Sequence, residues 1–255
     1  MKIISAPFGN YIQRAGWVST LGTFTPKYRG GLWWRLWRCM RTLRYDRRQR
    51  GWVNRLGLPN PGIDWLTGTP KRASLAAGKI ISVGIASDDD EQSFSDMILK
   101  LTLLNPLYFE LNASCPNEAR GLTEERMINL LGMLPDVGSK MILKLPPDVG
   151  RAHDLACMGI ENGITRFHCC NTLPTPRGGL SGPALIPIVV QVIDTLRMIE
   201  VPANLPRTEI IAGGGIDSPG IARLYRDHGA DHIAVGSAWL NPGNWSRITG
   251  IESEA

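Results

Sequence analysis

Short apolar runs rich in β-branched residues recur along the chain, and helical patterns separate many of them. The eight runs cover residues 2–6, 16–20, 79–85, 107–112, 140–145, 164–170, 209–212 and 232–235. Helical periodicity fits residues 91–103, 123–134, 149–157, 183–199 and 219–228. Such alternation of strands and helices is typical of a parallel sheet. The 255 residues are close to the roughly 250 that a single parallel barrel uses.

Eight parallel strands can close into a (β/α)8 barrel, and this is the α/β fold that we expect over one domain of residues 1–255. An open doubly wound sheet would need a Gly-x-Gly-x-x-Gly turn after its first strand, which the sequence lacks. About ten residues separate the first two runs, and the chain ends soon after the eighth, so the first and last outer helices are predicted to be reduced. The long connection between the second and third runs predicts a lid or cover at about residues 24–66.

Composition narrows the class of protein. The 43% hydrophobic and 20% charged residues are those of a globular chain with a sizeable core. Five cysteines are an odd number, two of them adjacent, which suits no disulfide framework and indicates a reducing compartment. No apolar run approaches the roughly 18 residues of a membrane span, and the start lacks a signal-peptide pattern. We therefore expect a cytoplasmic protein.

The most informative segment is residues 110–117, Glu-Leu-Asn-Ala-Ser-Cys-Pro-Asn, where a strand runs into a loop. Each asparagine amide offers a donor and an acceptor, which matches the edge of an imide or pyrimidine. Cys115 could serve as a nucleophile or a general base. The structural alternative is a capped turn with a buried cysteine.

Glycine clusters follow the last two runs, at residues 213–215 and at Gly236. Barrels commonly build a phosphate site from backbone N–H groups at this position. Lys144 lies within an apolar strand, where an unpaired ammonium is costly, so it must meet an anion or project into a polar cavity. His168, Cys169 and Cys170 point alternately to opposite faces of their strand, so we interpret them as barrel packing and predict no metal site.

Taken together, these segments resemble the dihydroorotate dehydrogenase family. The string at residues 112–117 is similar to its active-site signature, and residues 54–60 resemble its substrate loop. Residues 22–26 are similar to the turn after its second strand, and Lys144 matches the lysine of its fifth strand. Residues 171–172, 178–182, 213–216 and 236–237 match its sixth-strand amide, its glycine loop and its phosphate loops. The resemblance runs from about residue 5 to residue 242.

The resemblance implies an FMN enzyme that oxidises dihydroorotate to orotate in pyrimidine biosynthesis. Cys115 would take the proton from C5 while a hydride leaves C6 for flavin N5. Substrate-binding residues would be Asn54, Leu56, Gly57, Leu58, Asn112, Asn117, Asn171 and Thr172. FMN-binding residues would be Ala6, Thr23, Asn112, Lys144, Gly182, Gly214, Gly215, Gly236 and Ser237, with Lys144 at the N1–C2 edge of the flavin. The cysteine base is similar to class 1 of the family, whereas residues 22–26 and the short 178–182 loop are more similar to class 2.

The sequence departs from the family where a further lysine is expected near the substrate carboxylate or the flavin. Asn10 and Gly22 occupy these positions. The carboxylate of orotate would then need Arg55 or main-chain amides near Gly57, or the substrate is another dihydropyrimidine or enone. A weakened FMN-binding homologue is a third reading. The electron acceptor stays open between fumarate, quinone, oxygen and NAD through a partner subunit.

Residues 32–44 concentrate three tryptophans and four arginines. This segment could lie on an anionic membrane as a peripheral contact at the inner membrane face. Alternatively its tryptophans cover the barrel mouth as a lid or fill a homodimer interface. No recognised nucleic-acid-binding fold accompanies the segment, so we expect no nucleic-acid partner.

Overall fold

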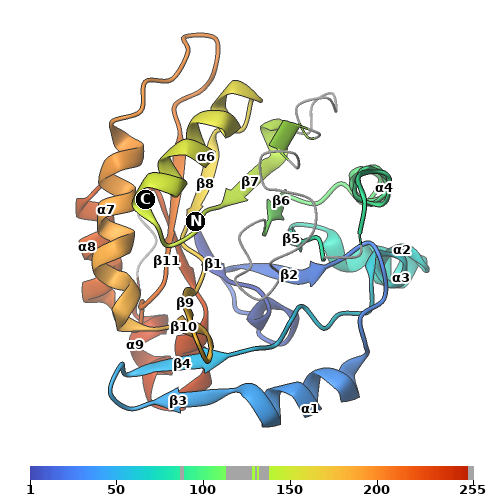
Figure 1. Ribbon diagram of the computed structural model, residues 1–255, viewed down its shortest axis with the longest axis horizontal. Coiled ribbons are helices and arrows are strands. Elements are labelled where there is room, and N and C mark those ends of the chain that lie inside the picture. The colour runs from blue at the N-terminus through green and yellow to red at the C-terminus, as the bar shows by residue number, and fades with distance from the viewer. Residues whose placement is uncertain (87–88, 113–127, 130, 132–137, 252–255) are drawn as a thin grey trace.

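Parallel strands form the centre of the molecule (Figure 1). The computed structural model describes residues 1–86, 89–112, 128–129, 131 and 138–251. Among these residues, the strands of the barrel close in the order β1-β12-β11-β8-β7-β6-β5-β2. Their bounds are β1 Lys2–Ile4, β2 Val18–Phe24, β5 Ile80–Val83, β6 Tyr108–Leu111, β7 Met141–Lys144, β8 Arg166–Cys169, β11 Glu209–Gly213 and β12 His232–Val235. The predicted (β/α)8 barrel is confirmed.

The barrel strands are buried on both faces, which is why they read as continuous apolar runs. Every residue of β5 and of β7 is buried. Inside the barrel, Ile3, Ile80, Ile142, Ile211 and Ala234 form one apolar layer. Because side chains alternate along a strand, residues two positions further along face the interior again, one layer closer to the carboxyl ends of the strands.

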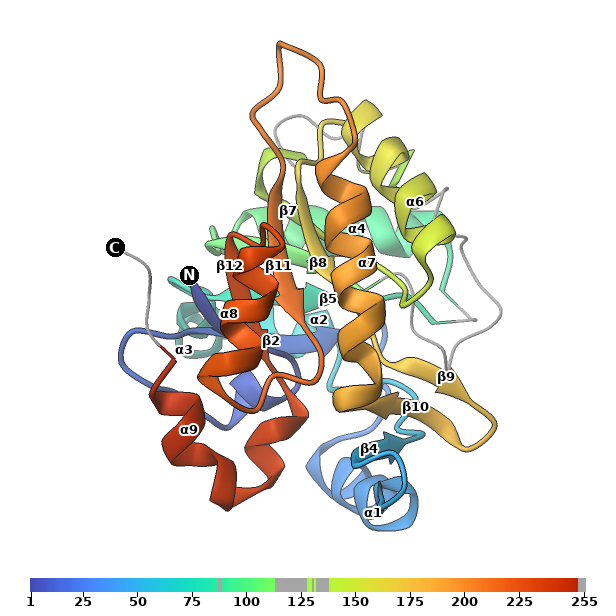
Figure 2. The same cartoon turned by 90° about the vertical axis from the view of Figure 1, so that its left-hand side faces the viewer.

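Helices cover the outside of the barrel, as Figure 2 shows for α7 and α8. Among the described residues, the long outer helices are α4 Glu91–Thr102, α6 Val149–Glu161, α7 Ile186–Arg197 and α8 Pro219–Asp227. Asp90 is the N-cap of helix α4. Its side chain accepts a hydrogen bond from the Ser93 backbone N–H, and the Ser93 side chain accepts one from the Asp90 N–H, which forms a capping box. Four residues of α4 face the core at helical spacing: Phe94, Met97, Ile98 and Leu101. The helix predicted at residues 123–134 lies largely outside the described residues.

The first and last connections are reduced, as predicted. Between β1 and β2 the structure has only the 3-10 helix η1 Phe8–Asn10. After β12 come η5 Ser237–Leu240, η6 Pro242–Asn244 and the five-residue helix α9 Trp245–Thr249. Further short elements are α2 Ile63–Thr67, α3 Pro70–Ala73, η2 Ser74–Ala76, η3 Gly138–Lys140 and η4 Pro183–Leu185. The helices α2 and α3 were not predicted.

A second, antiparallel sheet lies with helix α1 Leu32–Thr42 along the lower edge of Figure 1. Its order is β3-β4-β10-β9. The bounds are β3 Arg44–Asp46, β4 Gly51–Asn54, β9 Leu173–Thr175 and β10 Gly178–Ser181. The long connection after β2 supplies α1, β3 and β4, and it therefore forms the cover that was part of the predicted fold. Strands β9 and β10 complete the cover.

Two local expectations need correction. Residues 178–182 were expected to be a glycine loop, but Gly178–Ser181 form strand β10, which pairs with β4. Residues 22–24 were expected to belong to a turn, but β2 continues to Phe24, with a shift in its register against β5 between Leu21 and Phe24. Glycine at position 22 is required because its φ is +108° and an added Cβ would lie 2.4 Å from the Ser82 carbonyl oxygen.

Candidate active site

A cavity of about 580 Å3 lies between the carboxyl ends of the barrel strands and the cover. This volume is typical of a cofactor or small-molecule site. Every predicted site residue that the structure describes lines it: Ala6, Thr23, Asn54, Leu56, Gly57, Leu58, Asn112, Lys144, Asn171, Thr172, Gly182, Gly214, Gly215, Gly236 and Ser237. Cys115 and Asn117 lie outside the described residues. The barrel thus gathers residues from almost the whole chain at one rim.

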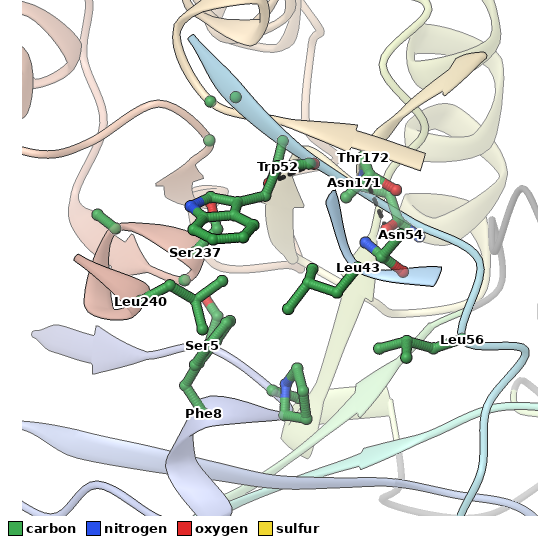
Figure 3. A pocket seen from close by; sticks show the side chains of 18 of the residues that line it. Ser5, Phe8, Leu43, Trp52, Asn54, Leu56, Asn171, Thr172, Ser237 and Leu240 are labelled. Atoms are coloured by element: carbon green, nitrogen blue, oxygen red, sulfur yellow. Dashed lines mark hydrogen bonds between the residues drawn. The ribbon is translucent and has the colours of Figure 1, made fainter. Parts of the chain in front are cut away.

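Polar side chains gather at one end of the cavity, where Figure 3 shows Asn54, Asn171 and Thr172 together. Asn171 Nδ2 donates to Asn112 Oδ1 over 2.8 Å. Asn112 Nδ2 in turn donates to Thr23 Oγ1 over 3.3 Å. These bonds orient both amides, so this end of the cavity presents fixed donors and acceptors to a ligand.

The opposite end is built from glycines and flanked by Trp52, Ser237 and Leu240 (Figure 3). Gly214 and Gly215 have φ values of +103° and +72°, which favour glycine. A Cβ on Gly215 would lie 2.7 Å from Ile186 Cγ1 and 3.0 Å from the Gly182 carbonyl oxygen. Tyr225 holds this turn from behind, since its hydroxyl donates to the Gly214 carbonyl over 2.7 Å. The main chain can therefore come close to a bound group such as a phosphate.

Lys144 reaches the cavity from β7, between the strands that lead to Asn112 and Asn171, and lies beside a buried acid and a buried histidine. Its ammonium lies 3.5 Å from Glu110 Oε1, and the other oxygen of Glu110 lies 2.6 Å from His168 Nδ1. Burial opposes ionisation of Glu110, but Lys144 and His168 outweigh it and lower the pKa of Glu110 to about 2. Burial, and next the charge of Lys144, lower the pKa of His168 below its ordinary value. The group thus holds Lys144 against a carboxylate and a neutral imidazole.

The sequence profile of the dihydroorotate dehydrogenase family matches residues 40–252. The chain belongs to the dihydroorotate dehydrogenase family.

Curated members of that family resemble the chain over about three quarters of its length. Dihydroorotate dehydrogenase A (fumarate) of Lactobacillus helveticus is 31% identical over an alignment of 217 residues, and the match covers 74% of this chain and 66% of the relative. The catalytic subunit of dihydroorotate dehydrogenase B (NAD(+)) of Thermoanaerobacter pseudethanolicus is 30% identical over an alignment of 213 residues, and the match covers 75% of this chain and 68% of the relative. The names of these relatives describe oxidoreductases.

The fold is also that of a solved structure of the family. Dihydroorotate dehydrogenase of Eimeria tenella in complex with ferulenol superposes with a TM-score of 0.75. The match covers 98% of this chain and 80% of that chain at 17% sequence identity, so it speaks for the fold alone.

The two positions where dihydroorotate dehydrogenases are expected to carry a lysine contact each other. Asn10 Nδ2 donates to the Gly22 carbonyl over 2.9 Å, and the Gly22 N–H donates to Asn10 Oδ1 over 3.0 Å. The pair fixes the backbone of β2 and supplies no charge. Arg55 is not among the described residues that line the cavity, since its guanidinium donates to the Pro176 carbonyl. The arginines that do line it are Arg35, Arg50 and Arg247.

Several residues of the cavity were missed in the sequence. Trp52 and Arg50 come from the cover, and Arg247 comes from α9, where no glycine or amide motif marks the position. His168 was assigned to packing, but it lines the cavity, as does Cys170. His168 pairs with Lys144 across β7 and β8 and therefore shares its face of the barrel, a register that the structure shows and the sequence does not.

Helix α1 of the cover has two different faces. Arg35, Leu36 and Cys39 line the cavity, whereas Trp33 and Met40 are 83% and 70% exposed. Residues of this helix therefore lie over the cavity, but none of its three tryptophans lines it, and the helix leaves an apolar and basic outer surface. Within the described residues, no helix has the length and apolar character needed to cross a bilayer.

Proposed function

We propose that this chain is an FMN-dependent dehydrogenase that oxidises dihydroorotate to orotate. One observation carries the proposal: the amide end, Lys144 and the glycine end occur in one cavity of suitable volume. This combination matches a ligand pair consisting of a small pyrimidine and a longer cofactor that ends in a phosphate. Membership in the dihydroorotate dehydrogenase family supports the same reaction.

The residues at the glycine end fit an FMN phosphate. The turn at Gly215 packs closely on Ile186 and Gly182, and a Cβ at this position would lie 2.7 Å from Ile186 Cγ1, so the main chain of the turn, rather than a side chain, faces the cavity. Gly214, Gly215, Gly236 and Ser237 would hold the phosphate, and the guanidinium of Arg247 lines the same cavity. Ala6, Thr23, Asn112 and Lys144 would contact the ring system. When bound, the flavin supplies a two-electron acceptor.

The amide end would hold the pyrimidine. Asn54, Asn112 and Asn171 would bind its carbonyl and N–H groups, and Thr172 lies beside them. Cys115 Sγ would take the C5 proton of dihydroorotate as its thiolate, and Asn117 would bind the ring next to it. Because Arg55 is directed to Pro176, the main chain around Gly57 is the better candidate of the two for the substrate carboxylate.

The names of the relatives favour fumarate or, through a partner subunit, NAD(+) as the electron acceptor. Steady-state turnover of dihydroorotate with fumarate, with NAD(+) and with a soluble quinone would rank these acceptors. Turnover with fumarate by the isolated chain would make a partner subunit unnecessary.

The outer surface of α1 favours a peripheral contact with anionic lipid. Trp33 and Met40 are exposed, and Arg38 and Arg41 accompany them on a helix without an acidic residue. Co-sedimentation with phosphatidylserine vesicles but not with phosphatidylcholine vesicles is expected, and Trp33→Ala should weaken it severalfold. Equal sedimentation with both vesicles, or dimers that dissociate in the Trp33→Ala variant, would contradict the lipid contact.

The decisive experiment is a visible spectrum of the purified protein, followed by anaerobic addition of dihydroorotate. We expect flavin absorbance that bleaches with the native protein and stays oxidised with Cys115→Ala, because only the native protein can remove the C5 proton. Bound flavin that dihydroorotate leaves oxidised would point to another dihydropyrimidine or enone. No flavin after reconstitution with FMN would rule out the proposed enzyme.

A further inference from the structure

A layer of polar side chains crosses the interior of the barrel directly beneath the cavity. Glu110 on β6, Lys144 on β7 and His168 on β8 belong to it, and the pairing Lys144↔His168 places the last two side by side. The side chains of Glu110 and His168 are 2% and 3% exposed. A buried carboxylate is costly unless it is paired, so this layer needs a reason in the chemistry of the site.

Glu110 uses both of its oxygens. Oε1 faces the ammonium of Lys144 at 3.5 Å, and Oε2 faces His168 Nδ1 at 2.6 Å. Ser82 also donates to this carboxylate. Ser82 Oγ lies 3.0 Å from Thr23 Oγ1, which accepts from Asn112. A continuous chain of hydrogen bonds therefore joins the buried carboxylate to the amide end of the cavity.

His168 fits inside the barrel because residue 213 is a glycine. A Cβ on Gly213, which faces His168 from β11, would lie 2.6 Å from His168 Nε2. The φ of Gly213 is not positive, so the need for glycine here is one of space. The first glycine of the 213–215 cluster therefore makes room for the imidazole, whereas the two that follow shape the turn at the cavity.

The charges of the layer nearly cancel. Lys144 is a cation, Glu110 is an anion, and burial favours the neutral form of His168. Reduction of a flavin adds negative charge to its ring, and a fixed cation beside the ring favours that change. How strongly Lys144 does so depends on its distance from the ring and on how far Glu110 offsets its charge.

We propose that Glu110 and His168 are positioning residues: His168 holds the Glu110 carboxylate, which holds and partly offsets the Lys144 ammonium and so limits the electron affinity of the bound flavin. This inference rests on the proposed FMN site. It assigns a function to a histidine and an acid that need not touch substrate or cofactor.

The two residues are expected to act in opposite directions. In Glu110→Gln the negative charge that offsets Lys144 is lost, so the bound flavin should be reduced more easily. Sulfite is an anion that adds to flavin N5, and its affinity should therefore rise at least tenfold. A tenfold change in a two-electron equilibrium corresponds to about 30 mV in midpoint potential. In His168→Leu both carboxylate oxygens can turn to Lys144 and draw the ammonium inward, so sulfite affinity falls at least threefold. His168→Asn, whose amide can donate in place of Nδ1–H, should restore it to within twofold of native.

The measurements are sulfite titrations and midpoint potentials of the FMN-loaded variants, with circular dichroism to establish folding. Glu209 and His232 form a control pair at 3.1 Å, at the amino-terminal ends of β11 and β12 and so away from the cavity. Glu209→Gln and His232→Asn should therefore change neither the sulfite affinity nor the midpoint potential. In Lys144→Met the effect of Glu110→Gln should vanish, because Glu110 acts through Lys144. If Glu110→Gln fails to bind FMN, Glu110→Asp serves in its place, because it keeps the negative charge. This variant should bind FMN and change the sulfite affinity by less than the tenfold expected for Glu110→Gln.

Variants that bind FMN but change sulfite affinity by less than twofold would overturn the inference and leave the proposed function intact. A loss of sulfite affinity in both Glu110→Gln and His168→Leu would also overturn it, since general loosening of the barrel predicts the same sign for both. Native protein that takes up no FMN would remove the inference and the proposed function together.

Discussion

Asn171 donates a hydrogen bond to Asn112, although the two residues follow strands that are not neighbours in the barrel. Asn112 follows β6 and Asn171 follows β8, and β7 with Lys144 lies between them. The bond of 2.8 Å therefore spans the rim above Lys144 and fixes the orientation of both amides. An amide held in this way loses little rotamer freedom when a ligand binds, which favours affinity.

Replacement of Asn171 by alanine should weaken binding of the pyrimidine. It removes one amide and releases the oxygen of Asn112 from its partner. We expect the Kd for orotate to rise at least tenfold, about 1.4 kcal/mol, while the Kd for FMN changes less than threefold. Perturbation of the flavin spectrum by orotate measures the first and flavin fluorescence the second. The exposed Asn204 offers the control Asn204→Ala, and an equal rise in both constants would show that the residue supports the whole cavity.

Gly215→Ala should impair the binding of FMN more than the strain of its backbone explains. The added Cβ would overlap Ile186 Cγ1 at 2.7 Å, so the turn that lines the cavity would have to move. Gly78 has a similar φ of +66°, but a Cβ there meets nothing within 4 Å, so Gly78→Ala measures the strain alone. We expect at least a tenfold rise in the Kd for FMN in Gly215→Ala and no change in Gly78→Ala. Equal FMN affinity in both variants would remove the glycine turn from the proposed phosphate site.

The barrel could be predicted from the sequence, but the cover sheet could not. The barrel strands are apolar on both faces and stand out from their surroundings. Strands β3 and β9 have three residues each and contain no fully buried position. Their sheet depends on pairing between distant segments, such as Asn54 with Gly179. No local pattern encodes such pairing, so residues 178–182 looked like a loop.

The site residues could be predicted as a set because a barrel brings the carboxyl ends of all its strands to one rim. His168, Cys169 and Cys170 were expected to alternate between two faces of one strand, but β8 ends at Cys169, and the side chains of Cys169 and Cys170 interact. All three residues are buried, as expected for packing, but His168 and Cys170 also line the cavity. The contact of His168 with Glu110 joins positions 58 residues apart and required the structure.

Gly213→Ala should destabilise the protein because its Cβ would overlap His168 Nε2 at 2.6 Å. Overpacking of a close-packed interior typically costs about 1–3 kcal/mol. The matched control is Gly220→Ala in α8, where a Cβ meets nothing within 4 Å and alanine is the better helix former. Urea denaturation should therefore show opposite signs for the two variants. An unchanged free energy of unfolding in Gly213→Ala would mean that His168 can move away from the added Cβ without loss of stability.

The stability of the protein should fall as the pH falls, and His168 should account for the first part of the loss. Burial and the charge of Lys144 lower the pKa of His168 below 6.5, so the unfolded chain takes up this proton first and gains stability below that pH. The contribution of Glu110, whose pKa is lowered from 4.5 to about 2, is present above pH 4.5 and is lost as the pH falls toward 2. Below pH 6.5 we expect the stability of the native protein to fall more steeply with pH than that of His168→Asn, by at most about 1.4 kcal/mol per pH unit, which is the limit for one proton. Urea denaturation at pH 6.5, 5.8 and 5.0 measures the two slopes. Parallel slopes would mean that His168 takes up its proton at the same pH in the folded and the unfolded chain, which contradicts a lowered pKa, and a shallower slope in the native protein would mean an imidazolium in the folded state.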